Sequence, residues 1–137
     1  LDITIRNGAK NYDSIIKYSN KCKNLKIIYK EFGISNYLNK IDLFIGSAST
    51  AIYEMSFLKT PSVFVICNKT QDYKISEMEK LGHYFLINLN EFKNKNFFKF
   101  LSNFLNNFKS IKNLFSYRKV IIDNLGANKV AKVIKNI

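Results

Sequence analysis

The residues best suited to binding chemistry form a turn of small side chains after an apolar run at positions 41–45. A predicted helix over 50–59 begins directly after this turn. Small side chains let a phosphate approach the backbone, and the free N–H groups and positive end of a helix attract anions. The turn therefore predicts an anion site with hydroxyl donors from Ser49 and Thr50. Its members are Gly46, Ser47, Ala48, Ser49 and Thr50.

The turn also has a purely structural interpretation, because Ser49 or Thr50 would cap the helix in many proteins. Glu54 favours the binding interpretation, since it follows Thr50 by one helical turn on the same side. A carboxylate there can accept hydrogen bonds from two vicinal hydroxyls, such as those of a ribose. A capping box would need Ser or Thr three residues before Glu54, and Ala51 stands there. A first-turn acid that complements the helix dipole is the remaining alternative.

Apolar periodicity predicts the elements that must position this turn. Strands are expected at residues 2–6, 25–29, 41–45, 62–66 and 84–87. Helices are expected at 11–20, 50–59, 70–80, 97–108, 111–123 and 127–137, with Gly82 as a C-terminal cap, and a loop with a short helix is expected at 31–40. This alternation is typical of βαβ units, whose ligands bind beyond the carboxyl ends of the strands. We predict one α/β domain over 1–137, a Rossmann-like parallel sheet with flanking helices and a helical C-terminal tail.

The charge of the chain is strongly positive, with 22 Lys and Arg against 10 Asp and Glu and a net charge of +12. A basic protein can bind nucleic acid, an anionic membrane or phosphorylated small molecules. The lysines are spread along the whole chain with no block of five or six, and the richness in Asn, Lys and Ile resembles a codon bias. The charge alone therefore selects no partner; we expect no specific nucleic acid and keep peripheral contact with an anionic membrane as an alternative.

Cysteine and histidine usage argues against a metal centre. Cys22 and Cys67 are far apart and have no His or Cys at ligand spacing, so we expect reduced thiols, no metal, no cofactor and a cytoplasmic location. His83, the single histidine, follows Gly82 into a strand and is interpreted as structural. We expect neither a membrane span nor a secretory leader. The chain does not begin with Met, so we expect a piece of a longer protein.

Three segments together resemble a known family. They are residues 42–54 (DLFIGSASTAIYE), 58–65 (LKTPSVFV) and 68–71 (NKTQ). Their order and spacing resemble the C-terminal domain of the GT-B enzymes related to MurG, and most of all the UDP-sugar hydrolases of the PseG and spore-coat SpsG type. Residues 123–130 (DNLGANKV) also resemble the start of the family's C-terminal helix. The resemblance implies the UDP-binding half of a bacterial, cytoplasmic two-domain hydrolase that acts in surface glycan or nonulosonic acid biosynthesis.

The resemblance also implies roles for particular residues toward a UDP-sugar. Glu54 would bind the ribose hydroxyls, and Gln71 would reach the ribose or the sugar. Tyr29 and Lys30 match the segment whose backbone reads uracil. The diphosphate would be held at the helix N-terminus by Ser47, Ala48, Ser49 and Thr50.

The chain departs from the family pattern in two ways. The family usually has glycine where this chain has Ala48, and its domain begins with another strand and a Gly-rich loop that have no counterpart here. The catalytic histidine of the hydrolases belongs to the N-terminal domain, so no catalytic residue is assigned and that domain is an expected partner.

Three alternatives stay open. The weakest is a flavodoxin-like scaffold without a ligand, because Asp42 begins its strand and so lies at the wrong edge of the sheet for a phosphorylation or metal role. A MurG-like UDP-sugar transferase would use the same nucleotide site, and a basic nucleic-acid or membrane-surface module would use the aromatic and lysine residues between Phe92 and Lys119. The helical spacing of the apolar residues there favours a core stripe instead; the stripe comprises Phe97, Phe100, Leu101, Phe104, Leu105 and Phe108. A sheet edge left exposed would also allow a dimer.

Overall fold

The chain forms two compact units, Leu1–Lys40 and Ile41–Ile137, in a computed structural model. The structure describes residues 2–5, 11–29, 35–69, 71, 75–83, 85–116 and 122–135. The single domain expected over 1–137 stays a prediction.

The first unit is a small βαβ arrangement. Strands β1 (Asp2–Ile5) and β2 (Lys26–Tyr29) pair in parallel, with Asp2 opposite Lys26 and Ile5 opposite Tyr29. Helix α1 (Tyr12–Ser19) lies between them in sequence, and the single-turn helix α2 (Ser35–Leu38) follows β2. Parallel strands need a crossover connection, and α1 supplies it.

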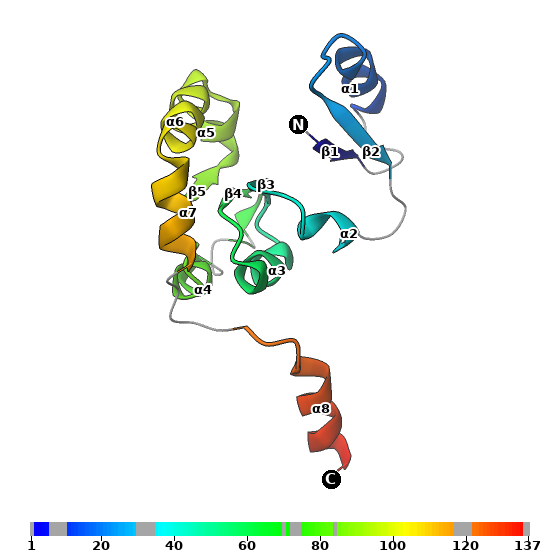
Figure 1. The fold of residues 1–137 in the computed structure, drawn as a ribbon, viewed down its shortest axis with the longest axis vertical. Coiled ribbons are helices and arrows are strands. Elements are labelled where there is room, and N and C mark those ends of the chain that lie inside the picture. The colour runs from blue at the N-terminus through cyan, green and yellow to red at the C-terminus, as the bar shows by residue number, and fades with distance from the viewer. Residues whose placement is uncertain are drawn as a thin grey trace. The chain divides into compact units, whose positions relative to one another are not determined.

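The second unit contains a parallel sheet in the order β3-β4-β5 (Figure 1). Its strands are β3 (Phe44–Ser47), β4 (Ser62–Ile66) and β5 (Phe85–Asn88). Helix α3 (Ala51–Leu58) connects the first pair of strands, and α4 (Ile75–Lys80) lies between the second pair. The predicted α/β class is confirmed: a three-stranded parallel sheet with flanking helices, consistent with a Rossmann-like fold.

Four helices follow β5. They are α5 (Leu89–Lys93), α6 (Lys95–Asn106), α7 (Phe108–Ser116) and α8 (Gly126–Lys135). Of these, α5 is absent from the sequence prediction. Its start is fixed by a capping box, in which the Asn88 side chain accepts from the Glu91 N–H and the Glu91 carboxylate accepts from the Asn88 N–H, both at 2.9 Å. The predicted helical tail is confirmed as α8.

One core cluster of the second unit lies between the sheet and α6–α7, and Ile52, Met55 and Met78 of α3 and α4 are also completely buried. Val63 of β4 packs in one cluster with Phe104, Ile111 and Phe115, all of which are buried. Burial of each such side chain contributes roughly 1.5–3 kcal/mol relative to exposure. Partly buried residues complete the cluster: Leu43, Phe85, Ile87, Phe97, Phe100 and Phe108.

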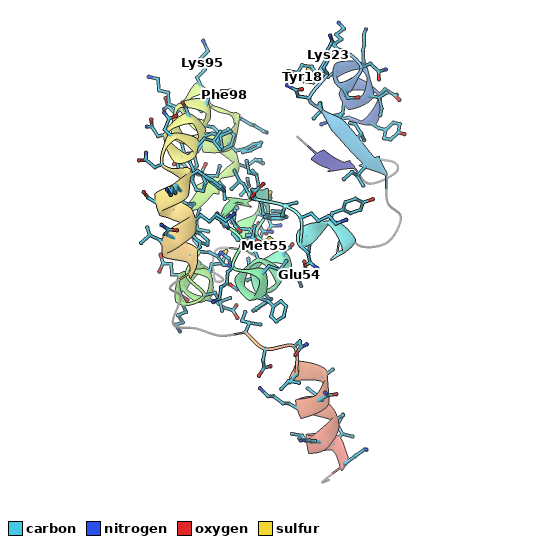
Figure 2. The ribbon with its side chains drawn as sticks, viewed as in Figure 1. Tyr18, Lys23, Glu54, Met55, Lys95 and Phe98 are labelled. Atoms are coloured by element: carbon cyan, nitrogen blue, oxygen red, sulfur yellow. The ribbon has the colours of Figure 1, made fainter. Side chains whose placement is uncertain are left out.

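Four members of the stripe predicted on 97–108 are therefore confirmed as core, namely Phe97, Phe100, Phe104 and Phe108. Leu101 is half-buried and does not belong to this cluster, and the prediction for Leu105 was wrong. Leu105 is 52% exposed. Phe98, two helical turns earlier on α6, is 71% exposed (Figure 2). At 100° per residue, Leu105 lies about 80–100° from the centre of the stripe, which is beyond the buried arc.

Several predicted boundaries also need correction. The strand expected at 41–45 occurs at Phe44–Ser47, because its ladder with β4 begins where Phe44 lies opposite Ser62. The helix expected at 70–80 is described only over Ile75–Lys80. Gly82 has a φ of 81°, and the N–H of His83 donates to the Met78 carbonyl at 2.8 Å, which confirms the predicted C-terminal cap.

Candidate functional site

The predicted anion-binding turn leaves the carboxyl end of β3 and enters α3. Ser47 is the last residue of β3 and lies opposite Val65 of β4. The next N–H, from Ala48, donates to the Val65 carbonyl at 3.1 Å. At the start of the turn, a Cβ on Gly46 would lie 2.6 Å from the tip of the Phe44 ring, so that a larger residue there would displace the ring. The turn is therefore anchored to the middle strand of the sheet.

The backbone N–H groups of the turn differ in whether they donate a hydrogen bond within the protein. The Ser49 N–H donates to the Ser47 carbonyl at 2.9 Å, and the Ala51 N–H reaches the Ser49 hydroxyl only at 3.5 Å, a weak bond. No described residue accepts a hydrogen bond from the Thr50 N–H. Thr50 and Ala51 are thus the backbone donors available to a ligand, and they lie at the positive end of the helix.

Helix capping does not consume the hydroxyl groups. Thr50 is the N-cap of α3, but its side chain makes no capping hydrogen bond. Its backbone is in the right-handed helical region, with φ −59° and ψ −19°, instead of the extended conformation typical of a capping side chain. Both Ser49 and Thr50 are exposed. Thr50 is therefore not a side-chain cap, and the Ser49 hydroxyl makes only the weak 3.5 Å contact with the Ala51 N–H.

Gln71 joins the loop after β4 to the turn after β3. Its Oε1 accepts a hydrogen bond from the Cys67 N–H at 2.7 Å, and its Nε2 donates to the Ser47 hydroxyl at 3.1 Å. Because an amide nitrogen cannot accept, the Cys67 N–H fixes which end of the amide faces Ser47. Parallel register brings together two residues 24 positions apart at one edge of the sheet.

Glu54 lies on the first turn of α3 and is exposed, whereas the next residue, Met55, is completely buried (Figure 2). Its position four residues after Thr50 places the two on one face of the helix. On the same helix the Tyr53 hydroxyl donates to the Glu77 carboxylate at 2.6 Å, which ties α3 to α4. Glu54 is thus presented on a helix that is fixed at both the strand and the neighbouring helix.

The other predicted site residues are placed differently. Ala48 is 1% exposed and its N–H is occupied by Val65, which counts against a phosphate-binding role. Tyr29 ends β2, but its side chain and all of Lys30 lie outside the described residues. Tyr29 belongs to the first unit and the turn to the second. Within the second unit, the structure places Ser47, Ser49, Thr50, Glu54 and Gln71 at or beside one turn.

His83 is completely buried, as expected for a structural residue. Its Nε2 donates to the Ile52 carbonyl at 2.7 Å and lies 2.8 Å from the Ser56 hydroxyl. Because a carbonyl oxygen only accepts, Nε2 carries a proton. The ring also packs edge-on against Phe64, with centroids 4.8 Å apart. His83 joins α3 to the sheet and has no exposed surface for a substrate.

The sequence prediction missed the Cys67 N–H, through which Gln71 is oriented. Cys67 is exposed and directly follows β4, so its place beyond a strand end was the only signal that could have marked it. Within the described part of the chain there is no cluster of three or more His, Cys, Asp or Glu residues able to hold a metal ion. The helices described there are also too short or too polar to cross a bilayer.

Comparison with known proteins gives no relative. No protein-family profile matches the chain, no curated protein matches it, and no solved structure matches it.

Proposed function

We propose that the chain is the UDP-binding half of a bacterial UDP-sugar hydrolase with a GT-B architecture. One observation carries the proposal: the turn from β3 into α3 offers backbone and hydroxyl donors, and Glu54 lies one helical turn further along. The N–H of Thr50 and the hydroxyls of Ser49 and Thr50 are suited to the two phosphates. The carboxylate of Glu54 is suited to the two ribose hydroxyls.

The order of the sequence motifs supports UDP in particular, because residues 42–54, 58–65 and 68–71 resemble those of the MurG-related enzymes. The chain supplies no catalytic group in this proposal. Its histidine, His83, is buried and already bonded, so the water or acceptor must be activated by residues of a partner domain. A UDP-sugar transferase would use the same nucleotide site. The proposal places the protein in a cytoplasm, where the thiols of Cys22 and Cys67 stay reduced.

Calorimetric titration with UDP, CMP and ADP tests the proposal. We expect UDP to bind best, and Glu54→Ala to weaken its binding by about 1–3 kcal/mol through loss of a charged hydrogen-bonding partner. Glu79→Ala is a matched control, since Glu79 is exposed on α4. Its UDP affinity should equal that of the unaltered chain.

The same titration with 2′-deoxy-UDP separates a ribose contact from a general charge effect. The unaltered chain should lose affinity for the deoxy nucleotide, whereas Glu54→Ala should bind both nucleotides equally. Equal affinity for UDP, CMP and ADP, or an unchanged affinity in Glu54→Ala, would count against this function.

A further inference from the structure

We propose that Gln71 is a positioning residue that holds the Ser47 hydroxyl with its proton directed to a bound diphosphate. This inference rests on the proposed function but assigns Gln71 a different role from the sugar contact that the sequence predicted. Both ends of its amide are already bonded to the protein, at 2.7 Å to Cys67 and 3.1 Å to Ser47. Because the oxygen and one N–H of the amide are used within the protein, we infer that the amide acts on the ligand through Ser47.

The direction of each hydrogen bond follows from the backbone. The Cys67 N–H can only donate, so the oxygen of the Gln71 amide must face it and the NH₂ group must face Ser47. The Ser47 oxygen therefore accepts from Gln71. Its own proton is not used in that bond, and no described residue accepts it.

The position of Ser47 makes this proton useful. Ser47 is exposed at the last position of β3, two residues before Ser49 and three before the available N–H of Thr50. A phosphate oxygen at the turn would complete the chain from Cys67 through Gln71 and Ser47. Hydrogen bonds in such chains polarise one another in one direction, which favours an anion at the end.

Two substitutions of Gln71 separate positioning from simple structural support. Gln71→Met removes both hydrogen bonds and keeps a side chain of similar length. Gln71→Glu keeps an acceptor for the Cys67 N–H but has no donor, so the Ser47 proton would turn to the new carboxylate. Asn90→Met is a control for loss of an exposed amide, and Ser102→Ala is a control for Ser47→Ala.

The first measurement uses the ligand-free chain and needs no nucleotide. Hydrogen exchange at the Cys67 amide should accelerate by about fivefold in Gln71→Met, because one net hydrogen bond of this kind is worth ~1 kcal/mol. The rate should stay near that of the unaltered chain in Gln71→Glu and Ser47→Ala. An unchanged rate in Gln71→Met would overturn the positioning role.

The second measurement compares UDP with uridine, which lacks the phosphates. We expect Ser47→Ala and Gln71→Met each to weaken UDP binding by about tenfold, as for a hydrogen bond to a charged group, and to leave uridine binding unchanged. The double variant should bind UDP no more weakly than Ser47→Ala alone, since Gln71 acts through Ser47. Additive losses, or a loss of uridine affinity in Gln71→Met, would overturn the inference and support direct contact with the ligand.

Binding of inorganic pyrophosphate, measured beside that of UDP, separates this inference from the proposed function. If the chain binds pyrophosphate but not UDP, the UDP function fails, and the same three variants decide the role of Gln71 with pyrophosphate. If the unaltered chain binds neither, the inferred anion contact of Ser47 is overturned together with the function.

Discussion

Lys59 is the only non-glycine residue with a positive φ in the part of the chain that the structure describes. At φ 55° and ψ 32° it ends α3, and the next N–H, from Thr60, donates to the Met55 carbonyl at 3.0 Å. This is the cap position where glycine is most often found. The Cβ of Lys59 therefore makes the left-handed backbone conformation at this position unfavourable.

Replacing Lys59 with glycine should raise the free energy of unfolding by about 0.5–1 kcal/mol. The left-handed conformation costs an L-residue roughly 1–2 kcal/mol, and the greater chain entropy of unfolded glycine offsets part of the gain. Urea unfolding measures the change. Lys59→Ala is the control, because it removes the charge and keeps the Cβ, so its stability should match that of the unaltered chain. A loss of stability in Lys59→Gly would contradict this account.

His83 is a polar residue that stabilises the fold, because its side chain is completely buried and hydrogen-bonded. His83→Ala should lower the free energy of unfolding by about 2–4 kcal/mol, through the cavity and the lost bonds to Ile52 and Ser56. Phe98→Ala, at a residue that is 71% exposed, should change stability by less than about 0.5 kcal/mol. Thermal or urea unfolding of the His83→Ala and Phe98→Ala variants measures the two changes. A fully stable His83→Ala variant with altered ligand binding would show instead that the histidine is functional.

At the scale of the elements, β3 depends on a glycine beside an aromatic ring. A Cβ on Gly46 would approach the Phe44 ring to 2.6 and 2.9 Å, and that ring packs on Phe64 with centroids 5.5 Å apart. Gly46→Ala should therefore lower the free energy of unfolding by about 1–3 kcal/mol, because the ring must leave its packed position. The double variant Gly46→Ala with Phe44→Leu should lose less than the sum of the two single variants. Additive losses would show that the ring and the methyl do not conflict.

The start of α8 is stabilised by a charged residue, and this gives it a pH dependence. The Asp123 carboxylate accepts from the Lys129 ammonium at 2.6 Å and from the Leu125 N–H at 3.1 Å. The Lys129 bond, followed by the Leu125 bond, lowers the pKa of Asp123 below its ordinary value. A lowered folded pKa means that this stabilisation is present above the unfolded value and is lost as pH falls through the folded value.

We therefore expect α8 to lose helicity below about pH 4, where an ordinary Asp begins to take up its proton. Carbon chemical shifts of 124–130, followed from pH 6 to pH 2, report this change. Asp123→Asn should abolish the pH dependence, because the amide keeps an acceptor for Leu125 but has no charge for Lys129. Asp42→Asn, at an exposed carboxylate that pairs with Lys112, should leave the titration of α8 intact. A transition that persists in Asp123→Asn would exclude Asp123 as its cause.

These elements also show what the sequence could predict. β4 was predicted with its observed bounds, because Pro61 and the β-branched run of 62–66 are local signals. The start of β3 was misplaced, because it is set by the ladder with β4 and not by its own residues. The helix α5 was missed, since five residues are too few for apolar periodicity to reveal.

The candidate site divides in the same way. The small-residue turn and Glu54 were found because strand, turn and helix are adjacent in the sequence. The bond from Gln71 to Ser47 spans 24 residues and depends on the parallel register, so no local pattern could predict it. The occupied N–H of Ala48 likewise depends on a carbonyl of the neighbouring strand.

For the whole molecule, the central question is whether its positively charged side chains form a surface that binds nucleic acid. A basic module for nucleic acid needs exposed aromatic rings on which bases can stack. Between 97 and 108 the rings of Phe97, Phe100, Phe104 and Phe108 instead belong to the core cluster with Val63 or pack against it. These four rings are therefore not available to stack on bases, whereas Phe98 in the same stretch is 71% exposed.

A net charge of +12 should itself act on the stability of the fold. In water, two unit charges ~20 Å apart repel by about 0.2 kcal/mol, and a compact chain holds many such pairs. Salt at 0.15 M reduces the screening length to about 8 Å, so most of this repulsion disappears. We therefore expect the free energy of unfolding to rise with NaCl between 10 and 150 mM, by an amount on the order of 1 kcal/mol.

Two comparisons separate general screening from a bound anion. Potassium fluoride should stabilise the chain as much as NaCl at equal ionic strength, because screening does not depend on the identity of a monovalent ion. Phosphate or pyrophosphate at micromolar concentration should add stability only if the turn at 47–50 binds it, and Ser47→Ala should remove that increment while the response to NaCl stays. A chain that NaCl destabilises would show that favourable ion pairs outweigh repulsion, so that the excess of lysine is balanced locally despite the formal charge.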